Sequence, residues 1–165
     1  MIGSIIKGGG SGKAKVSLGN VKLGTNAGIK LSSDDDDNVA IGTNALNSTT
    51  TDSNDNVAIG TDAGTAITTG DDNICIGNGS GASLTDGSRN ISIGHDANNA
   101  EGSLLDSVFI GTENCAAGGG NNMVSIGSKS LKLSTGTLTN TTLVGSSTGD
   151  ASAGAFEQST YIGYG

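Results

Sequence analysis

The chain has no proline, no tryptophan, two phenylalanines and two tyrosines among its 165 residues. Aromatic side chains contribute the largest apolar area per residue, so a rounded globular core is not expected. No apolar run reaches the roughly 18 residues that a membrane-spanning helix needs. The apolar stretch at the N-terminus is also too short for a secretory signal peptide. We therefore expect a thin core of valine, isoleucine and leucine, and no membrane insertion.

Basic residues are also scarce, with 8 Lys and Arg against 16 Asp and Glu, which gives a net charge of −8. An acidic shaft repels nucleic acid and anionic membranes, so neither is an expected partner. The cysteines, Cys75 and Cys115, lack metal-ligand spacing and lie two repeats apart. This separation is too large for an easy disulfide, and we expect buried free thiols.

What the sequence does have is a repeat. A motif of the type N-V-A-I-G recurs every 16 to 18 residues. Its glycines are Gly24, Gly42, Gly60, Gly77, Gly94, Gly111, Gly127, Gly145 and Gly163. Self-similarity at a fixed period indicates an architecture in which each unit buries its apolar face against its neighbours. We predict an all-β fold, a parallel β-helix or β-roll solenoid of about nine coils.

Apolar residues stand three and one positions before the first seven of these glycines, which is the period-2 pattern of a short strand with one buried face; threonine replaces the first of them before Gly145 and Gly163. We predict that these two columns form the core ladder. Its members are Val39, Ile41, Val57, Ile59, Ile74, Ile76, Ile91, Ile93, Val108, Ile110, Val124 and Ile126. Glycine reaches positive φ without steric cost and permits a sharp corner after each strand. The predicted corner glycines are Gly42, Gly60, Gly77, Gly94, Gly111 and Gly127.

Three further columns accompany the strands. The residue between the two apolar columns is mostly small, and we predict that it faces neighbouring chains. An irregular apolar site follows about seven residues after the glycine, at Leu31, Ile67 and Leu84, and predicts an incomplete second wall. Asparagine stands four residues before five successive glycines. This column predicts a ladder of stacked amides, or it reflects only the tolerance of asparagine for turns.

One strong strand per coil does not enclose a dry core. The hexapeptide pattern of a left-handed β-helix fits Ile41 to Leu46, but the next two hexads begin with Asn47 and Ser53, where that fold needs aliphatic residues. The missing walls are expected to come from other copies of the chain. We therefore predict a homotrimer.

The first nineteen residues differ from the rest. Residues 1–19 combine an apolar tip with a Gly/Ser-rich stretch of flexible-linker composition. We predict a flexible docking segment at 1–19 and a repetitive shaft at 20–165. The predicted docking residues are Ile2, Ile5, Ile6 and Lys7.

The stretches DNVAIGTNAL, NDNVAIGTDAG, RNISIGHDAN and NMVSIGSKS resemble two related groups of repeats. One is the tail-fibre and tailspike repeats of bacteriophages, and the other is the head repeats of trimeric autotransporter adhesins. The resemblance covers residues 20–165. It implies a trimeric stalk on a particle or cell surface that serves in attachment.

Trimeric adhesins carry a signal peptide and a membrane anchor, for which this sequence shows no pattern. A virion fibre or spike is therefore the favoured expectation, docked on another virion protein through residues 1–19, with a host surface receptor as a further candidate partner. A surface adhesin fragment is the first alternative. A left-handed β-helix acyltransferase is the second.

Catalytic chemistry is not expected. His95 is the sole histidine and sits in a turn, where we expect it to be solvated. No Ser/His/Asp or Cys/His set stands outside the repeat register, and we predict no enzyme, no cofactor and no metal. Five residues before the glycines runs an acidic column that Arg89 interrupts: Asp37, Asp55, Asp72 and Asp106. We interpret it as a solvated edge, with bridging by Ca²⁺ as the alternative.

Overall fold

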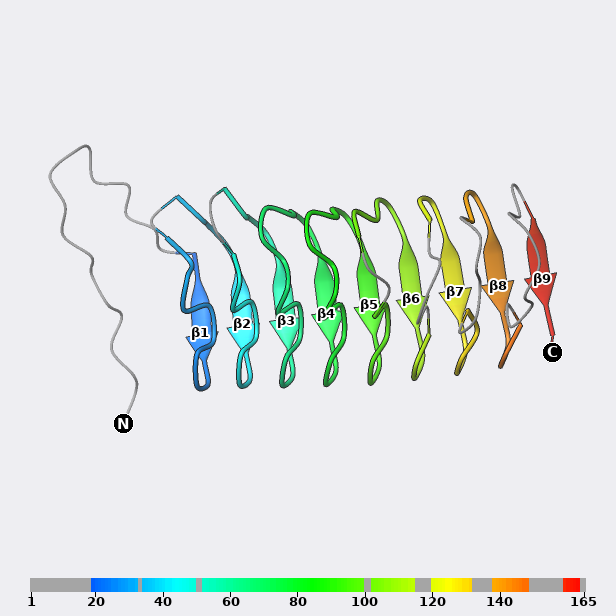
Figure 1. Cartoon of the computed structure of the whole chain (residues 1–165), viewed down its shortest axis with the longest axis horizontal. Coiled ribbons are helices and arrows are strands. Elements are labelled where there is room, and N and C mark those ends of the chain that lie inside the picture. Colours follow the sequence, from blue (N-terminus) through cyan, green and yellow to red (C-terminus); the bar gives the residue numbers. More distant parts are fainter. Residues whose placement is uncertain are drawn as a thin grey trace, which may run out of the picture.

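Nine parallel strands, each three residues long, form one sheet in which every strand pairs with the next along the chain (Figure 1). The computed structural model describes residues 19–32, 34–49, 52–99, 102–114, 120–131, 138–148 and 159–163. The strands are β1 Val21–Leu23, β2 Val39–Ile41, β3 Val57–Ile59, β4 Ile74–Ile76, β5 Ile91–Ile93, β6 Val108–Ile110, β7 Val124–Ile126, β8 Thr142–Val144 and β9 Thr160–Ile162. No helix occurs in these ranges. The predicted all-β parallel solenoid is confirmed.

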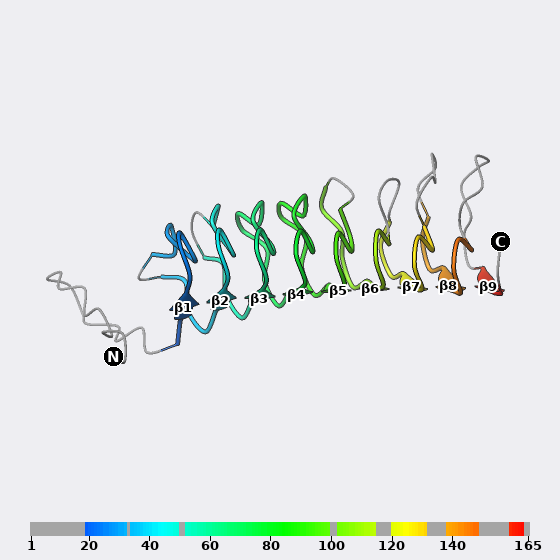
Figure 2. The same ribbon diagram turned by 90° about the horizontal axis from the view of Figure 1, so that it is seen from below.

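The strands lie along one side of the rod, and the rest of each coil extends away from the other side of the sheet (Figure 2). The molecule is therefore a row of narrow coils with one continuous sheet face. We call the residues between one strand and the next a coil, and the glycine directly after each strand its corner glycine.

Neighbouring strands pair in exact step, so equivalent residues of successive repeats lie side by side. Between β2 and β3, for example, Ala40 pairs with Ala58 and Ile41 with Ile59. Every other pair of neighbouring strands keeps this register. The first, middle and third residues of the strands therefore form three columns along the rod. We call the first and third columns the outer columns and the middle one the inner column.

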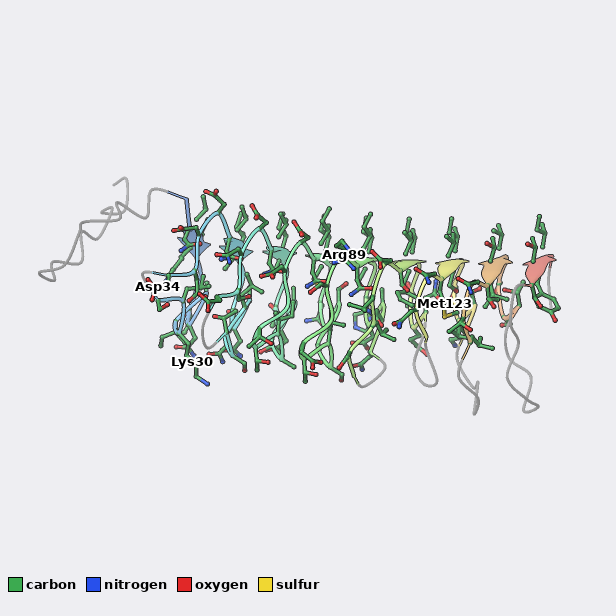
Figure 3. All side chains as sticks on the ribbon, turned by 90° about the horizontal axis from the view of Figure 1, so that it is seen from above. Lys30, Asp34, Arg89 and Met123 are labelled. Carbon is green, nitrogen blue, oxygen red and sulfur yellow. The ribbon has the colours of Figure 1, made fainter. Side chains whose placement is uncertain are left out.

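The inner column faces the core of the chain itself. From β2 to β8 its residues are at most 2% exposed: Ala40, Ala58, Cys75, Ser92, Phe109, Ser125 and Leu143. The outer columns are half-buried or exposed. In Figure 3 a row of side chains stands out from the strands on the side away from the loops. The small middle residues, predicted to face neighbouring chains, therefore face inward.

The predicted core ladder is wrong as an account of this chain's interior. The outer columns stack as predicted but lie on the outside of the sheet: Val39, Ile41, Val57, Ile59, Ile74, Ile76, Ile91, Ile93, Val108, Ile110, Val124 and Ile126. The physical reason is that each coil folds back against the inner side of its own strand, so the middle residues pack against loop side chains such as Leu46 and Ile67 and the outer columns stay outside. Period-2 alternation separates the two faces of a strand but does not say which one is buried.

Side chains from the loops complete the core behind the sheet. They include the predicted second wall and several residues outside it: Leu31, Leu46, Ile67, Leu84, Leu104, Met123, Leu131 and Leu138. Met123, labelled in Figure 3, lies on the loop side of the strands. The chain therefore closes its own core. The argument that a single chain leaves its interior open is wrong, although it does not decide whether copies associate.

The predicted corner glycines adopt backbone conformations that other residues rarely reach. Their φ angles lie between +130° and +139°. A Cβ added at Gly60 would stand 2.5 Å from the carbonyl oxygen of Gly77 in the next coil. Both the backbone angle and this close approach between coils require glycine.

The predicted asparagine ladder is present and buried. Asn56 donates from its backbone N–H to Oδ1 of Asn38 at 3.0 Å, and from Nδ2 to the same oxygen at 3.2 Å. Asn73 and Asn90 repeat the arrangement with the asparagine of the preceding coil. Ser107 ends it, donating its backbone N–H to Asn90 Oδ1. These bonds join successive coils inside the rod and satisfy polar groups that burial would otherwise leave unpaired.

Candidate functional site: an apolar face on the sheet

The outer columns form a continuous apolar surface, which we call the apolar stripe. It consists of Val21, Leu23, Val39, Ile41, Val57, Ile59, Ile74, Ile76, Ile91, Ile93, Val108, Ile110, Val124, Ile126, Thr142, Val144, Thr160 and Ile162. All but the two threonines are aliphatic. With strands about 4.8 Å apart, nine strands span about 38 Å along the rod.

Exposure along the stripe follows the stacking of its side chains. Most of its residues are half-buried, because the equivalent residues of the two neighbouring coils cover their flanks. Exposure is highest at the two ends, with 66% at Leu23 and 79% at Ile162. In the middle, Ile59 and Ile126 still reach 37% and 38%. What remains open is the outward tip of each side chain, and these tips form one surface.

An acidic column runs beside the stripe, two residues before each strand. Asp37, Asp55, Asp72 and Asp106 are exposed and have φ near +57°, a left-handed conformation that aspartate tolerates better than most residues. Arg89 interrupts the column (Figure 3). The described residues include no group of three or more His, Cys, Asp or Glu placed to hold a metal ion. The geometry matches the solvated edge expected from the sequence.

Arg89 and Asp106 pair across neighbouring coils. Arg89 Nε lies 2.5 Å from Asp106 Oδ1, and Nη2 lies 3.0 Å from Oδ2. The hydrogen bonds and charge of the guanidinium hold the pKa of Asp106 below its usual value and raise the pKa of Arg89. Both side chains are well exposed, so the pair adds little to stability.

Two residues of opposite charge, Lys22 and Asp35, lie near the N-terminal end of the core. In β1 the inner column holds Lys22, whose Nζ donates to the carbonyl oxygens of Gly28 at 2.7 Å and Leu31 at 3.4 Å. Asp35 is fully buried and accepts hydrogen bonds from Ser32 and from the backbone N–H of Ser53. The sequence analysis missed both residues as functional parts of the fold. The alignment of repeats shows that Lys22 occupies the inner column, but it does not show that its side chain bonds to the carbonyl oxygens of the following coil.

The charges of this end are balanced. Burial lowers the pKa of Lys22, while the nearby carboxylate of Asp35 opposes that shift. Burial raises the pKa of Asp35, but its hydrogen bonds from Ser32 and Ser53 and the charge of Lys22 outweigh burial, so the pKa is lower than usual. Asp35 is therefore ionised at neutral pH, and its hydrogen bonds from Ser32 and Ser53 satisfy the buried carboxylate.

The other candidate residues lie apart from one another. Cys75 is buried and free, and burial raises the pKa of its thiol to about 12. His95 is 58% exposed in its side chain and contacts Asp96, with Nδ1 3.2 Å from Oδ2. Cys115 and the predicted docking residues Ile2, Ile5, Ile6 and Lys7 lie outside the described residues.

Comparison of the chain with protein-family models, with curated proteins and with solved structures gives no significant match. Within the described ranges there is also no helix long and apolar enough to cross a lipid bilayer. The apolar stripe and its acidic border are therefore the features from which a function has to be argued.

Proposed function

We propose that the chain is a structural virion protein, a fibre or spike that assembles as a homotrimer through the apolar stripe and serves in host attachment. The observation that carries this proposal is the stripe itself. It is about 38 Å long and about 10 Å wide, an area of about 400 Å² in projection. The largest exposed apolar patch on a monomeric protein typically measures about 300–600 Å² and is often functional.

The shape of the stripe favours a second and third copy of the same chain as its occupants. A straight, regular row of aliphatic side chains is matched best by an identical row with the same spacing between coils. The stripe is two columns wide, so one column can pack against each of two neighbours. This is a heterologous contact that closes after three copies around a common axis.

The acidic column favours assembly in which only the apolar stripe is covered. Asp37, Asp55 and Asp72 are exposed at the border of the stripe, where burying them unpaired would be unfavourable, so apolar contacts that cover the border are disfavoured. A net charge of −8 also keeps a long rod soluble. An apolar centre with a charged border is the usual anatomy of a protein interface.

The location on a virion and the role in attachment rest on the resemblance of the repeats to phage fibre repeats. A rigid rod, with glycine-rich corners and almost no aromatic residues, is suited to displaying a distal end at a distance from a particle. Residues 1–19 would bind another virion protein. The stripe is equally compatible with an adhesin fragment on a cell surface, which is the alternative.

The attachment role is tested with purified protein and intact particles. An antibody raised against the chain should label a projecting fibre in electron micrographs of phage particles that contain the chain. Added in excess, the assembled protein should reduce adsorption of those particles to host cells, and Ile76→Asp, which breaks assembly, should not. Labelling of cell envelopes instead of particles would contradict the virion proposal and support the adhesin alternative.

A further inference from the structure

Asn98 lies inside the rod, in the coil that follows β5 and four residues after the corner glycine Gly94. Its side chain is 0% exposed, and neither Oδ1 nor Nδ2 has a hydrogen-bond partner in the part of the chain that the structure describes. A buried amide left unpaired is unfavourable, because it gives up its hydrogen bonds to water without replacing them. Native proteins pair nearly all such groups. The position therefore points to a ligand with both donor and acceptor capacity.

Ser92, in the strand directly before this coil, supplies a further unpaired group. It is the middle residue of β5, it is 0% exposed, and its Oγ also finds no partner among the described residues. Thr49 Oγ1 is also buried without a partner among the described residues, but it lies in the coil after β2, three repeats away. Ser92 and Asn98 belong to one repeat, so a single bound molecule would pair both of them.

The repeat geometry places the two side chains opposite each other. The position four after the corner glycine faces the middle residue of the preceding strand. A Cβ built at Gly64 lies 3.6 Å from the Cβ of Ala58, and one built at Gly81 lies 3.6 Å from the Cβ of Cys75 in β4. These glycines have φ of +56° and +62°, and Asn98 has +51°. Asn98 is therefore directed at Ser92 as its counterparts are at theirs.

A serine and an asparagine elsewhere inside the rod form a direct hydrogen bond. Ser125 Oγ donates to Oδ1 of Asn114 at 2.7 Å. At the position of Asn98, two other coils carry leucine, Leu46 and Leu131, both 0% exposed. Asparagine is smaller than leucine. Asn98 therefore places an amide at an interior position where other coils place an apolar side chain.

We infer that one water molecule is bound inside the rod between Ser92 and Asn98. It accepts a hydrogen bond from Asn98 Nδ2 and donates one hydrogen to Asn98 Oδ1 and the other to Ser92 Oγ. Three hydrogen bonds are typical of a buried water, which occupies about 30 Å³. A cation would bind only the two oxygens and leave the Nδ2 donor unpaired, so the donor set selects water.

The test is a crystal structure at a resolution that shows ordered water, for the natural chain and for Asn98→Leu. We expect a density peak about 2.7–3.2 Å from Asn98 Nδ2, Asn98 Oδ1 and Ser92 Oγ. In Asn98→Leu the peak should be absent and the leucine should pack as Leu46 does. Should that variant not fold, Ser92→Ala gives the same comparison, because alanine already occupies this position in β2 and β3. The peak should then lose its contact at the strand.

Two results would overturn the inference. One is a direct hydrogen bond between Asn98 and Ser92, or from either to another protein group, with no peak between them. The other is a peak surrounded by five or six oxygen atoms at the short distances of a metal ion.

Discussion

Ile76→Asp should abolish assembly while leaving the single chain folded. Ile76 is the third residue of β4, half-buried on the outer side of the sheet, where its tip is available to a partner. If about one-fifth of the side chain is exposed, roughly 35 Å² remains for a partner to cover, which contributes about 0.9 kcal/mol. The substituted carboxylate costs more. An unpaired charge in an apolar interface costs about 3 kcal/mol per chain or more, so about 9 kcal/mol per trimer and roughly a 10⁶-fold weaker association.

The assay is sedimentation equilibrium at micromolar concentration, with circular dichroism on the same samples. Asn78→Asp is the matched control, because it adds the same charge two residues further on at an exposed position beside the stripe. The control should assemble as the natural chain does. Ile76→Asp should sediment as a folded monomer with its β-sheet signal retained.

Two outcomes would refute this reasoning. If Ile76→Asp assembles like the control, the stripe is not the contact between copies. If it loses its sheet signal as a monomer, then Ile76 supports the core of its own chain and the assignment of faces is wrong. Ala58→Asp, on the inner column, should unfold the chain and shows what the second outcome looks like.

Three further predictions concern the coil itself. Gly77→Ala should strongly lower the melting temperature measured by circular dichroism. At this position φ is +130°, and the new Cβ would lie 2.4 Å from the carbonyl oxygen of Gly94. An unchanged melting temperature would contradict the described corner. Cys75 should resist alkylation in the folded protein and react after denaturation, because its thiol is buried with a pKa of about 12. Peptide mass spectrometry measures the alkylated fraction, and alkylation of the folded protein would contradict the burial of Cys75. Asp35 has a lowered folded pKa, so its contribution to stability is present above its usual value of 3.8 and is lost as the pH falls through the folded value. Asp35→Asn should therefore be less stable than the natural chain at neutral pH, and the difference should shrink on acidification below 3.8. A constant difference across that range would contradict the stabilising role of the ionised, hydrogen-bonded carboxylate.

The strands and corners could be predicted from the sequence to the residue. Each strand ends directly before its glycine, because two aliphatic residues separated by one and followed by glycine leave few other local structures. Which face of each strand points into the core could not be predicted in the same way. In the V-A-I segment of β2, both faces are apolar, so alternation alone does not distinguish Ala40 from its neighbours.

The rest of the core was only partly accessible. Ile67 and Leu84 were recognised as a second wall, whereas Leu46 and Met123 were not, because loops of unequal length shift such residues out of a fixed register. The inward-facing polar group of Asn98 could not be found either. Nothing in a single sequence separates an asparagine that tolerates a turn from one whose side chain is sealed inside.

The measurement that tests the central claim most directly is the molar mass of the unmodified protein in solution, by light scattering on a size-exclusion column. Because the sheet presents its aliphatic columns outward, the account predicts three chains of 16.0 kDa in one particle, about 48 kDa. A stable species of 16.0 kDa at all concentrations would contradict it. The apolar face would then be free surface.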